Sequence, residues 1–246
     1  MKRAFLAPGA AALALLLASC GEDGNGSAGV NLQAPLTPIA APNAGDWREV
    51  VATTPEGGTR IGNPQAPVKL VEYGSLTCPA CRAFSETATA RLRDPYIRSG
   101  QVSWEFRHLI IHGAPDVALA LLANCRPPAA FFGTIERIYD QQPQILARFD
   151  DEEQARIRSL PADTVLVPVA EAMELGPFFA QLGLPGSRFQ QCLADRPAAQ
   201  RLADVTNRAM TLEGVGGTPT FFVNGERLTV TAWSDLEPIL RQRIGG

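Results

Sequence analysis

Two cysteines separated by two residues, Cys78 and Cys81, constrain this chain more than any other feature. They follow an apolar run over residues 68–74, which predicts a buried strand, and they open a helical pattern over 82–92. At a strand-to-helix junction, two thiols at this spacing can close a small disulfide ring, and the helix N-terminus lowers the pKa of the first thiol. Because only the thiolate attacks disulfides, the placement predicts thiol chemistry as well as a fold.

The first twenty residues predict export. Lys2 and Arg3 precede an Ala- and Leu-rich apolar stretch, residues 5–18, which is too short to span a bilayer and has the flanks of a secretory signal. The stretch ends in Leu-Ala-Ser-Cys-Gly, which resembles a bacterial lipobox. We therefore expect residues 1–20 to be a lipoprotein signal peptide with Cys20 as the lipidated residue. The alternative is a plain signal peptide with an incidental cysteine.

Residues 21–45 are rich in Gly, Asn, Ser, Ala and Pro, so we expect a flexible tether with a reach of roughly 25–30 Å. The segment 46–246 is long enough for one well-cored domain. The chain has a net charge of −3 with scattered Lys and Arg, which argues against a nucleic-acid partner. Nothing after Cys20 is apolar for long enough to predict a transmembrane helix.

The chain has five cysteines, and four remain if Cys20 carries lipid. An even number suits an oxidising compartment. Cys78 and Cys81 can pair locally, which leaves Cys125 and Cys192, each in a helix-like segment, as a candidate structural disulfide. Two alternatives stay open for this second pair: independent buried thiols that pack as small hydrophobes, or a second redox-active pair.

Strands are also predicted over residues 46–53 and 101–109, the latter because its apolar and polar residues alternate. Strand character returns at 219–223, and the Asn224-Gly225 turn predicts a hairpin into 226–230. Between these regions, from about residue 113 to residue 211, the pattern is almost wholly helical. The predicted helices cover residues 116–124, 129–140, 151–159, 164–174, 178–182, 187–194 and 198–213, and a last one covers 233–244.

This order of elements indicates an α/β fold, a thioredoxin-like sheet with an inserted helical subdomain at about 113–211. Pro219 stands at the head of a predicted strand, where a missing ladder donor is tolerated. In thioredoxin folds, such a proline is cis and faces the cysteine pair, and the residue before it presents its backbone to an extended substrate. The alternative is an ordinary trans proline that begins a strand.

Several segments together resemble the DsbA family of periplasmic thiol–disulfide oxidoreductases, over roughly residues 46 to 246. They are residues 62–68, residues 71–73, the motif Cys78-Pro79-Ala80-Cys81 and residues 217–221. The resemblance implies that Cys78 is the exposed nucleophile, which forms a mixed disulfide with the substrate. Cys81 would be the buried partner that resolves this intermediate or re-forms the ring.

The resemblance also assigns the surroundings of the pair. Glu72 stands where such proteins carry a buried acid beneath the active site, a proton acceptor for Cys81 whose pKa burial would raise. The alternative for Glu72 is a surface position on the strand. Thr218 and Pro219 would line the substrate groove, together with Pro79 and Ala80.

The sequence departs from the best-known members at Ala80, where they carry histidine. A side chain that could stabilise the thiolate is therefore absent, which leaves the redox potential open. His108 and His112 are the only histidines, and neither is near the pair in sequence. We expect the pair to form disulfides in exported proteins, with disulfide isomerase or reductase activity as the alternative. The residues before Asp46 are too few and too polar for a dimerisation domain, which argues against an isomerase.

Two other classes of function stay open. A structural zinc site at the cysteine pair would need two more ligands, for which only the spacing of His108 and His112 offers support. A non-catalytic, chaperone-like lipoprotein on the same fold would not need Cys78. We expect no metal, no cofactor and a monomer. The expected partners are reduced or misfolded exported proteins and a membrane redox protein, in the bacterial cell envelope and facing the periplasm, with inner or outer membrane undecided.

Overall fold

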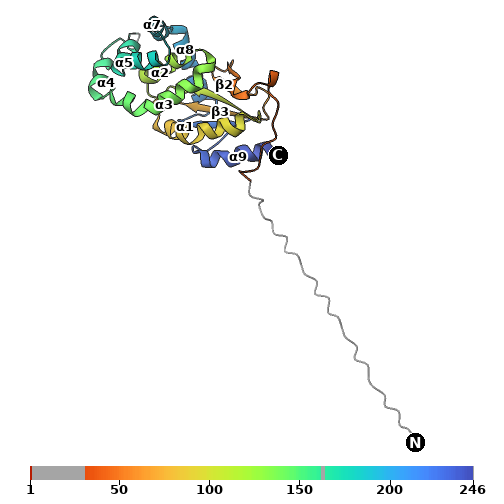
Figure 1. The fold of residues 1–246 in the computed structure, drawn as a ribbon. Coiled ribbons are helices and arrows are strands. Elements are labelled where there is room, and N and C mark those ends of the chain that lie inside the picture. Colours follow the sequence, from red (N-terminus) through yellow and green to blue (C-terminus); the bar gives the residue numbers. More distant parts are fainter. Residues whose placement is uncertain (2–30, 162–163, 246) are drawn as a thin grey trace.

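A computed structural model describes residues 1, 31–161 and 164–245 of the protein. The predicted signal peptide beyond Met1, including Cys20, lies outside the described residues. Six strands form one sheet in the order β1-β2-β4-β3-β5-β6 (Figure 1). They are β1 (Val51–Thr53), β2 (Thr59–Gly62), β3 (Val68–Gly74), β4 (Val102–His108), β5 (Thr220–Val223) and β6 (Glu226–Arg227).

The centre of the sheet is β3, which runs parallel to β4 and antiparallel to β5. Side chains alternate between the two faces of a strand, so Val68, Leu70 and Glu72 share one face. Both apolar members of this set are at most 1 % exposed, because helices cover that face. The strand therefore carries a carboxylic acid into an otherwise apolar layer.

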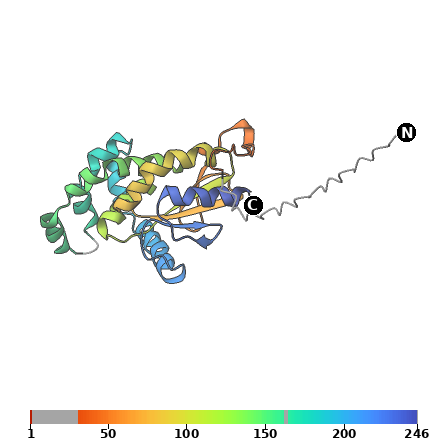
Figure 2. The ribbon, with the colours of Figure 1, turned by 90° about the horizontal axis from the view of Figure 1, so that it is seen from below.

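Helices lie on both faces of the sheet (Figures 1 and 2). On one face, Phe84 of a helix packs its ring 4.5 Å from that of Phe221 in β5. On the other face, Val205 and Ala209 of another helix cluster with Tyr73 of β3. The first layer consists of α1 (Pro79–Arg91), α3 (Phe131–Ala147) and α9 (Trp233–Gly245), and the second is α8 (Arg196–Leu212).

The predicted block of helices lies between β4 and β5 in the chain, and the α/β class is confirmed. Besides α3 and α8, the block contains α2 (Ala114–Asn124), α4 (Asp151–Arg158), α5 (Leu166–Ala172), α6 (Leu175–Gln181) and α7 (Gly186–Leu193). Cys125 at the end of α2 forms a disulfide with Cys192 of α7, across 67 residues and a Cα–Cα distance of 5.9 Å. This bridge confirms the candidate structural disulfide and excludes two independent thiols.

Shorter helical turns connect these elements. They are η1 (Pro42–Ala44), η2 (Trp47–Glu49), η3 (Leu92–Ile97) and η4 (Pro128–Ala130). The strand predicted over 46–53 is therefore wrong in its first half, where η2 replaces it. The side chain of Asp46 accepts a hydrogen bond from the Arg48 N–H, which favours a turn at this point.

The sequence did not predict β2, because Gly58 and Gly62 indicate turns. In the structure, β2 pairs with both β1 and β4. Gly62 has a φ of 103°, and a Cβ there would lie 3.0 Å from the Val102 carbonyl oxygen. The glycine therefore allows close approach within the sheet rather than ending it.

In the described part of the predicted tether over 21–45, several residues are bonded to the domain, although most of this segment is exposed. The Arg241 guanidinium donates to the backbone carbonyls of Leu32 and Ala34 at 2.7 and 2.6 Å. Further along, the Ile39 N–H donates to the Ser99 carbonyl at 2.7 Å. These bonds use backbone groups, so the polar, Pro-rich composition that predicted a tether does not prevent them. Residues 21–30 lie outside the described part of the chain.

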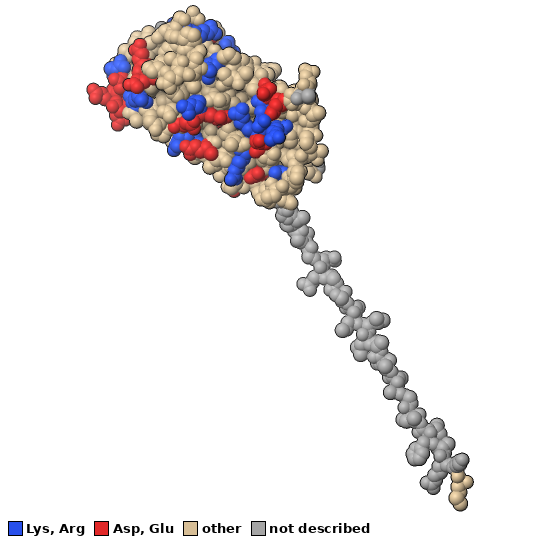
Figure 3. Space-filling view, in the orientation of Figure 1, with Lys and Arg blue, Asp and Glu red and all other residues tan. Residues whose placement is uncertain are grey.

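Acidic and basic side chains are interspersed on the face shown in Figure 3. This mixture agrees with the small net charge of −3. Within the described residues, no helix is both long enough and apolar enough to cross a membrane.

Candidate active site

Cys78 and Cys81 occupy the first turn of α1, directly after a short turn that leaves β3. Cys78 is the N-cap residue, Pro79 begins the helix, and the Arg82 N–H donates to the Cys78 carbonyl at 3.1 Å. Both cysteines are free thiols. Cys81 is fully buried, whereas Pro79 and Ala80 are exposed beside Cys78. Cys78 is itself only 7 % exposed, so the expectation of an exposed nucleophile is wrong in this structure: the thiol is covered, and the exposed residues of the motif are its neighbours Pro79 and Ala80.

The pKa of Cys78 is lowered to about 5, chiefly because the Cys81 side chain forms a hydrogen bond with it. Burial opposes this effect, and the backbone N–H groups of Cys81 and Ala80 support it. The start of a helix provides such unpaired N–H groups, so the local fold itself stabilises the thiolate. At neutral pH, Cys78 is consequently a thiolate for most of the time.

The pKa of Cys81 moves in the opposite direction and lies well above that of an ordinary thiol. Burial is the main cause, followed by the hydrogen bond with Cys78 and the negative charge of Glu72. The protein thus separates the two thiols by environment: a reactive thiolate at Cys78 and a protonated thiol at Cys81.

Glu72 lies on β3 and is 2 % exposed. Its Oε2 accepts a hydrogen bond from the Trp104 indole at 3.1 Å. Burial raises the pKa of this carboxyl to about 8, although the indole bond opposes the shift. A carboxyl that titrates close to neutral pH is able to hold or accept a proton, and its charge is felt by Cys81.

The opposite wall of the site is the segment that leads into β5. The Thr218–Pro219 peptide bond is cis, as the family resemblance implies. Cys78 Sγ lies 3.4 Å from the Thr218 carbonyl oxygen, to which it donates when the thiol is protonated. Residues 140 positions apart therefore meet at one place, where the carbonyl of Thr218, the residue before the cis proline, faces Cys78.

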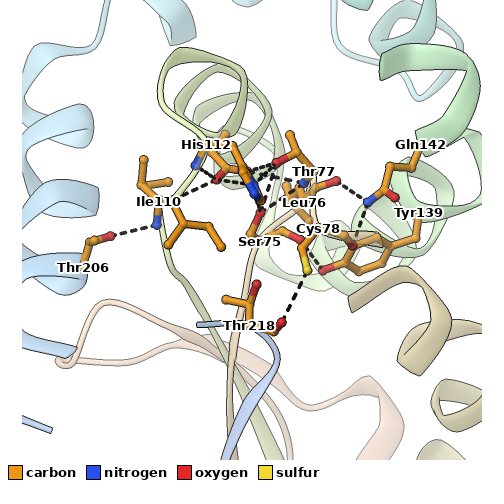
Figure 4. Close-up of polar contacts among 12 residues, drawn as sticks. Ser75, Leu76, Thr77, Cys78, Ile110, His112, Tyr139, Gln142, Thr206 and Thr218 are labelled. Carbon is orange, nitrogen blue, oxygen red and sulfur yellow. Dashed lines mark hydrogen bonds and ion pairs between the residues drawn. The ribbon is translucent and has the colours of Figure 1, made fainter. Parts of the chain in front are cut away.

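Two residues of α3 hold the active-site turn, and the sequence analysis missed both (Figure 4). The Gln142 amide donates to the carbonyls of Leu76 and Cys78 at 2.9 and 3.1 Å. The Tyr139 hydroxyl donates to the Ser75 carbonyl at 3.2 Å. Gln142 is 2 % exposed, so a buried amide on an otherwise apolar helix face was the available signal.

A third contact to the turn comes from Asp116 of α2, whose Oδ1 accepts from the Ser75 and Thr77 hydroxyls at 2.8 and 2.7 Å. The N-cap residue of α1 is Cys78, and among the described residues no side chain caps the helix. The Thr77 hydroxyl also contacts Nδ1 of His112 at 2.7 Å. His112 is therefore part of the active-site surroundings.

The two histidines have different hydrogen-bond partners. His108 is buried, its Nε2 contacts the Asn124 side chain at 3.2 Å, and burial lowers its pKa to about 4. His112 is 48 % exposed beside Thr77. Within the described residues, no group of three or more His, Cys, Asp and Glu side chains has the arrangement of a metal site.

Comparison with known proteins places these features in a family. The family model described as thioredoxin matches residues 54–242. A Rickettsia felis protein that carries the name protein-disulfide oxidoreductase is 29 % identical over 165 residues, which are 67 % of this chain and 52 % of that protein. The chain thus spans about half the length of this relative.

Solved structures give the same result. A crystal structure named as a protein-disulfide isomerase from Novosphingobium aromaticivorans has a TM-score of 0.72 and 28 % identity, covering 76 % of this chain and 97 % of that one. The alpha-DsbA1 of Wolbachia pipientis, at 18 % identity and a TM-score of 0.63, covers 78 % and 94 % and shows the same fold. The chain therefore belongs to the thioredoxin family, with a fold like that of the DsbA structures.

Proposed function

We propose that this protein forms disulfides in exported proteins by donating a Cys78–Cys81 disulfide. The observation that carries this proposal is the contrast between the two thiols of the reduced form. The low pKa of Cys78, about 5, reflects a thiolate that hydrogen bonds stabilise. A protein that stabilises its reduced form favours the reduction of its own disulfide, which makes it an oxidant of other thiols.

The reaction begins with the oxidised pair. A substrate thiolate attacks Cys78 Sγ, a mixed disulfide forms, and the electron pair of the broken S–S bond stays on Cys81. A second substrate thiolate attacks the substrate sulfur of the mixed disulfide, which forms the substrate disulfide and releases the Cys78 thiolate. Glu72, with a pKa of about 8, supplies the proton that Cys81 takes up and accepts it again on reoxidation.

Substrate binds in the groove beside Cys78. The exposed Pro79 and Ala80 form one side, and the Thr218 backbone with Pro219 forms the other. Recognition through main-chain hydrogen bonds to the Thr218 backbone would suit unfolded chains of varied sequence.

A second candidate activity is disulfide isomerisation or reduction, and the observation in its favour is the name of the Novosphingobium neighbour at 28 % identity. Both activities use the same pair of cysteines. They differ in the state that the cell maintains, because a disulfide donor is kept oxidised and an isomerase or reductase is kept reduced.

The site of action follows from the sequence. The signal-like residues 1–20 support export, and lipidation of Cys20 would anchor the domain to a membrane of the cell envelope. We expect a membrane redox protein to reoxidise the pair, and a monomer to suffice for catalysis.

The test is the oxidation of a reduced, unfolded substrate protein by the oxidised chain lacking residues 1–20. One disulfide should form per molecule added, and Cys78→Ser should abolish the reaction. Equal activity in Cys78→Ser would refute the mechanism. A wild-type chain that rearranges incorrect disulfides faster than it forms new ones would favour the isomerase activity.

A further inference from the structure

Asp116 accepts hydrogen bonds from Ser75, Thr77 and the His112 backbone, and these three residues lie together beside Cys78 in Figure 4. The Asp116 side chain is 1 % exposed, and its Oδ2 accepts from the backbone N–H groups of Ile111 and His112 at 3.0 and 2.9 Å. Its Oδ1 accepts from the hydroxyls of Ser75 and Thr77. One buried carboxylate thus joins the loop before α2 to the turn that positions Cys78.

These contacts fix the tautomer of His112. A threonine hydroxyl has one proton to donate, and Thr77 gives it to Asp116 Oδ1 at 2.7 Å. In the 2.7 Å contact between Thr77 Oγ1 and His112 Nδ1, the oxygen must therefore accept, so Nδ1 carries the hydrogen. In the neutral imidazole, the lone pair is consequently on Nε2.

The imidazole is exposed next to the residue that precedes the reactive cysteine. Thr77 is bonded directly to Cys78, and the His112 side chain is 48 % exposed. Among residues 31–161 and 164–245, the charged partner of the ring is Asp116, whose Oδ2 is 3.6 Å from Nδ1. The other polar contacts of the ring are to the hydroxyls of Thr77 and Ser75, at 2.7 and 3.4 Å.

We propose that His112 accepts the proton of the substrate thiol that attacks the Cys78–Cys81 disulfide; this inference rests on the proposed function. Nε2 takes the proton, and the electron pair of the substrate sulfur forms the new bond to Cys78 Sγ. The old S–S bond breaks, and its electron pair stays on Cys81, which is then protonated. The imidazolium returns its proton to water. Ala80 leaves no histidine between the cysteines, and His112 supplies one from another loop.

The size of the effect follows from the acidity of ordinary thiols. A cysteine with a pKa of about 8.5 is about 3 % thiolate at pH 7, so a base can accelerate attack by at most about 30-fold. At pH 9 most of the substrate is already thiolate, and the base has little to add. A histidine that accepts this proton therefore matters at neutral pH and loses its effect in alkali.

The experiment compares the oxidised wild-type chain with His112→Gln in stopped-flow reactions with a reduced cysteine peptide from pH 6 to pH 9. We expect His112→Gln to be about 10-fold slower at pH 7 and to approach the wild-type rate at pH 9. Added imidazole should restore part of the rate in His112→Ala. Thr77→Val should also react more slowly at pH 7 than at pH 9 relative to the wild type, but by a smaller factor, because valine no longer holds the His112 hydrogen on Nδ1.

Thr87→Val is the matched control, since its hydroxyl bonds to the Ala83 carbonyl on α1 at 3.0 Å, away from the chain of contacts. It should react as the wild type does. Rates for His112→Gln that equal the wild type at pH 7, or that fall by the same factor at pH 7 and pH 9, overturn the inference. Failure of the proposed function is distinct, because the wild-type chain itself would then leave the peptide reduced at every pH.

Discussion

Replacing Glu72 with Gln tests whether the acid beneath the cysteine pair is protonated in the folded protein. The carboxyl is 2 % exposed and has one hydrogen-bond donor, the Trp104 indole at 3.1 Å. Its pKa is raised from 4.5 to about 8, mainly by burial. Gln has nearly the same shape and never ionises, so Glu72→Gln removes the titration and keeps most of the packing.

The sign of the effect follows from the direction of this shift. The folded protein holds the Glu72 proton more tightly than the unfolded chain does, so its stability is highest below pH 4.5 and falls as the pH rises to about 8. For one carboxyl with these two pKa values, the loss between pH 5 and pH 8 is about 3 to 4 kcal/mol. Glu72→Gln does not lose stability in this way, because the glutamine side chain does not ionise.

The assay is urea unfolding of the oxidised proteins at pH 5, 6, 7 and 8, because a disulfide removes the titration of both thiols. We expect the free energy of unfolding of Glu72→Gln, relative to that of the wild type, to increase by about 3 to 4 kcal/mol between pH 5 and pH 8. Glu152→Gln, at an exposed position in α4, should parallel the wild type. If the difference between wild type and Glu72→Gln is the same at pH 5 and pH 8, Glu72 ionises normally and the reasoning fails.

Two further predictions concern the cysteines. In the reduced protein, thiolate absorbance at 240 nm should titrate with a midpoint near pH 5. Cys81→Ala should raise this midpoint, because the hydrogen bond from Cys81 is the largest cause of the lowered Cys78 pKa. An unchanged midpoint in that variant would contradict this assignment. The double variant Cys125→Ala/Cys192→Ala opens a loop of 67 residues and should lose about 4 kcal/mol of unfolding free energy while it exchanges thiols at the wild-type rate. A loss of exchange activity at a temperature where the variant is folded would instead make the bridge part of the reaction.

The parts of the site that the sequence predicted are local ones. Cys78 and Cys81 share one helical turn, and the helix that lowers the Cys78 pKa begins at the same residues. Pro219 could be recognised because it begins a strand just before an Asn-Gly turn. In each case, the chemistry depends on neighbours within a few residues, which a sequence displays directly.

The parts that were missed depend on packing between distant segments. Asp116 looked like the start of a helix, and Gln142 lay beyond the helix predicted over 129–140, although α3 continues to Ala147. Both bond to the turn before Cys78, 39 and 64 residues away from their respective partners. Only the arrangement of α2 and α3 over the end of β3 brings them there, and nothing in their spacing along the chain indicates it.

His112 shows how a correct observation can lead to an incomplete interpretation. The motif indeed has Ala80 where histidine is common, and the sequence therefore suggested a site without an imidazole. The loop after β4 brings one to Thr77, with a contact of 2.7 Å. The stabilisation of the Cys78 thiolate comes from a further source, the Cys81 thiol and the N–H groups of the helix start, which every helix possesses.

A contact between distant segments also explains why the structure of the segment before the domain was not predicted. Its composition predicted a tether, whereas Arg241, more than 200 residues later, holds the carbonyls of Leu32 and Ala34. The guanidinium in turn lies over the Tyr96 ring, 4.9 Å from its centre. Low hydrophobicity predicts weak burial but does not exclude attachment through the backbone.

The equilibrium potential of the Cys78–Cys81 couple against glutathione tests the central claim most directly. Disulfide donation requires the stabilised Cys78 thiolate to make the couple oxidising, with a potential above about −200 mV, on the side of known disulfide donors. A potential near that of thioredoxin, about −270 mV, would contradict donation and make the protein a reductase.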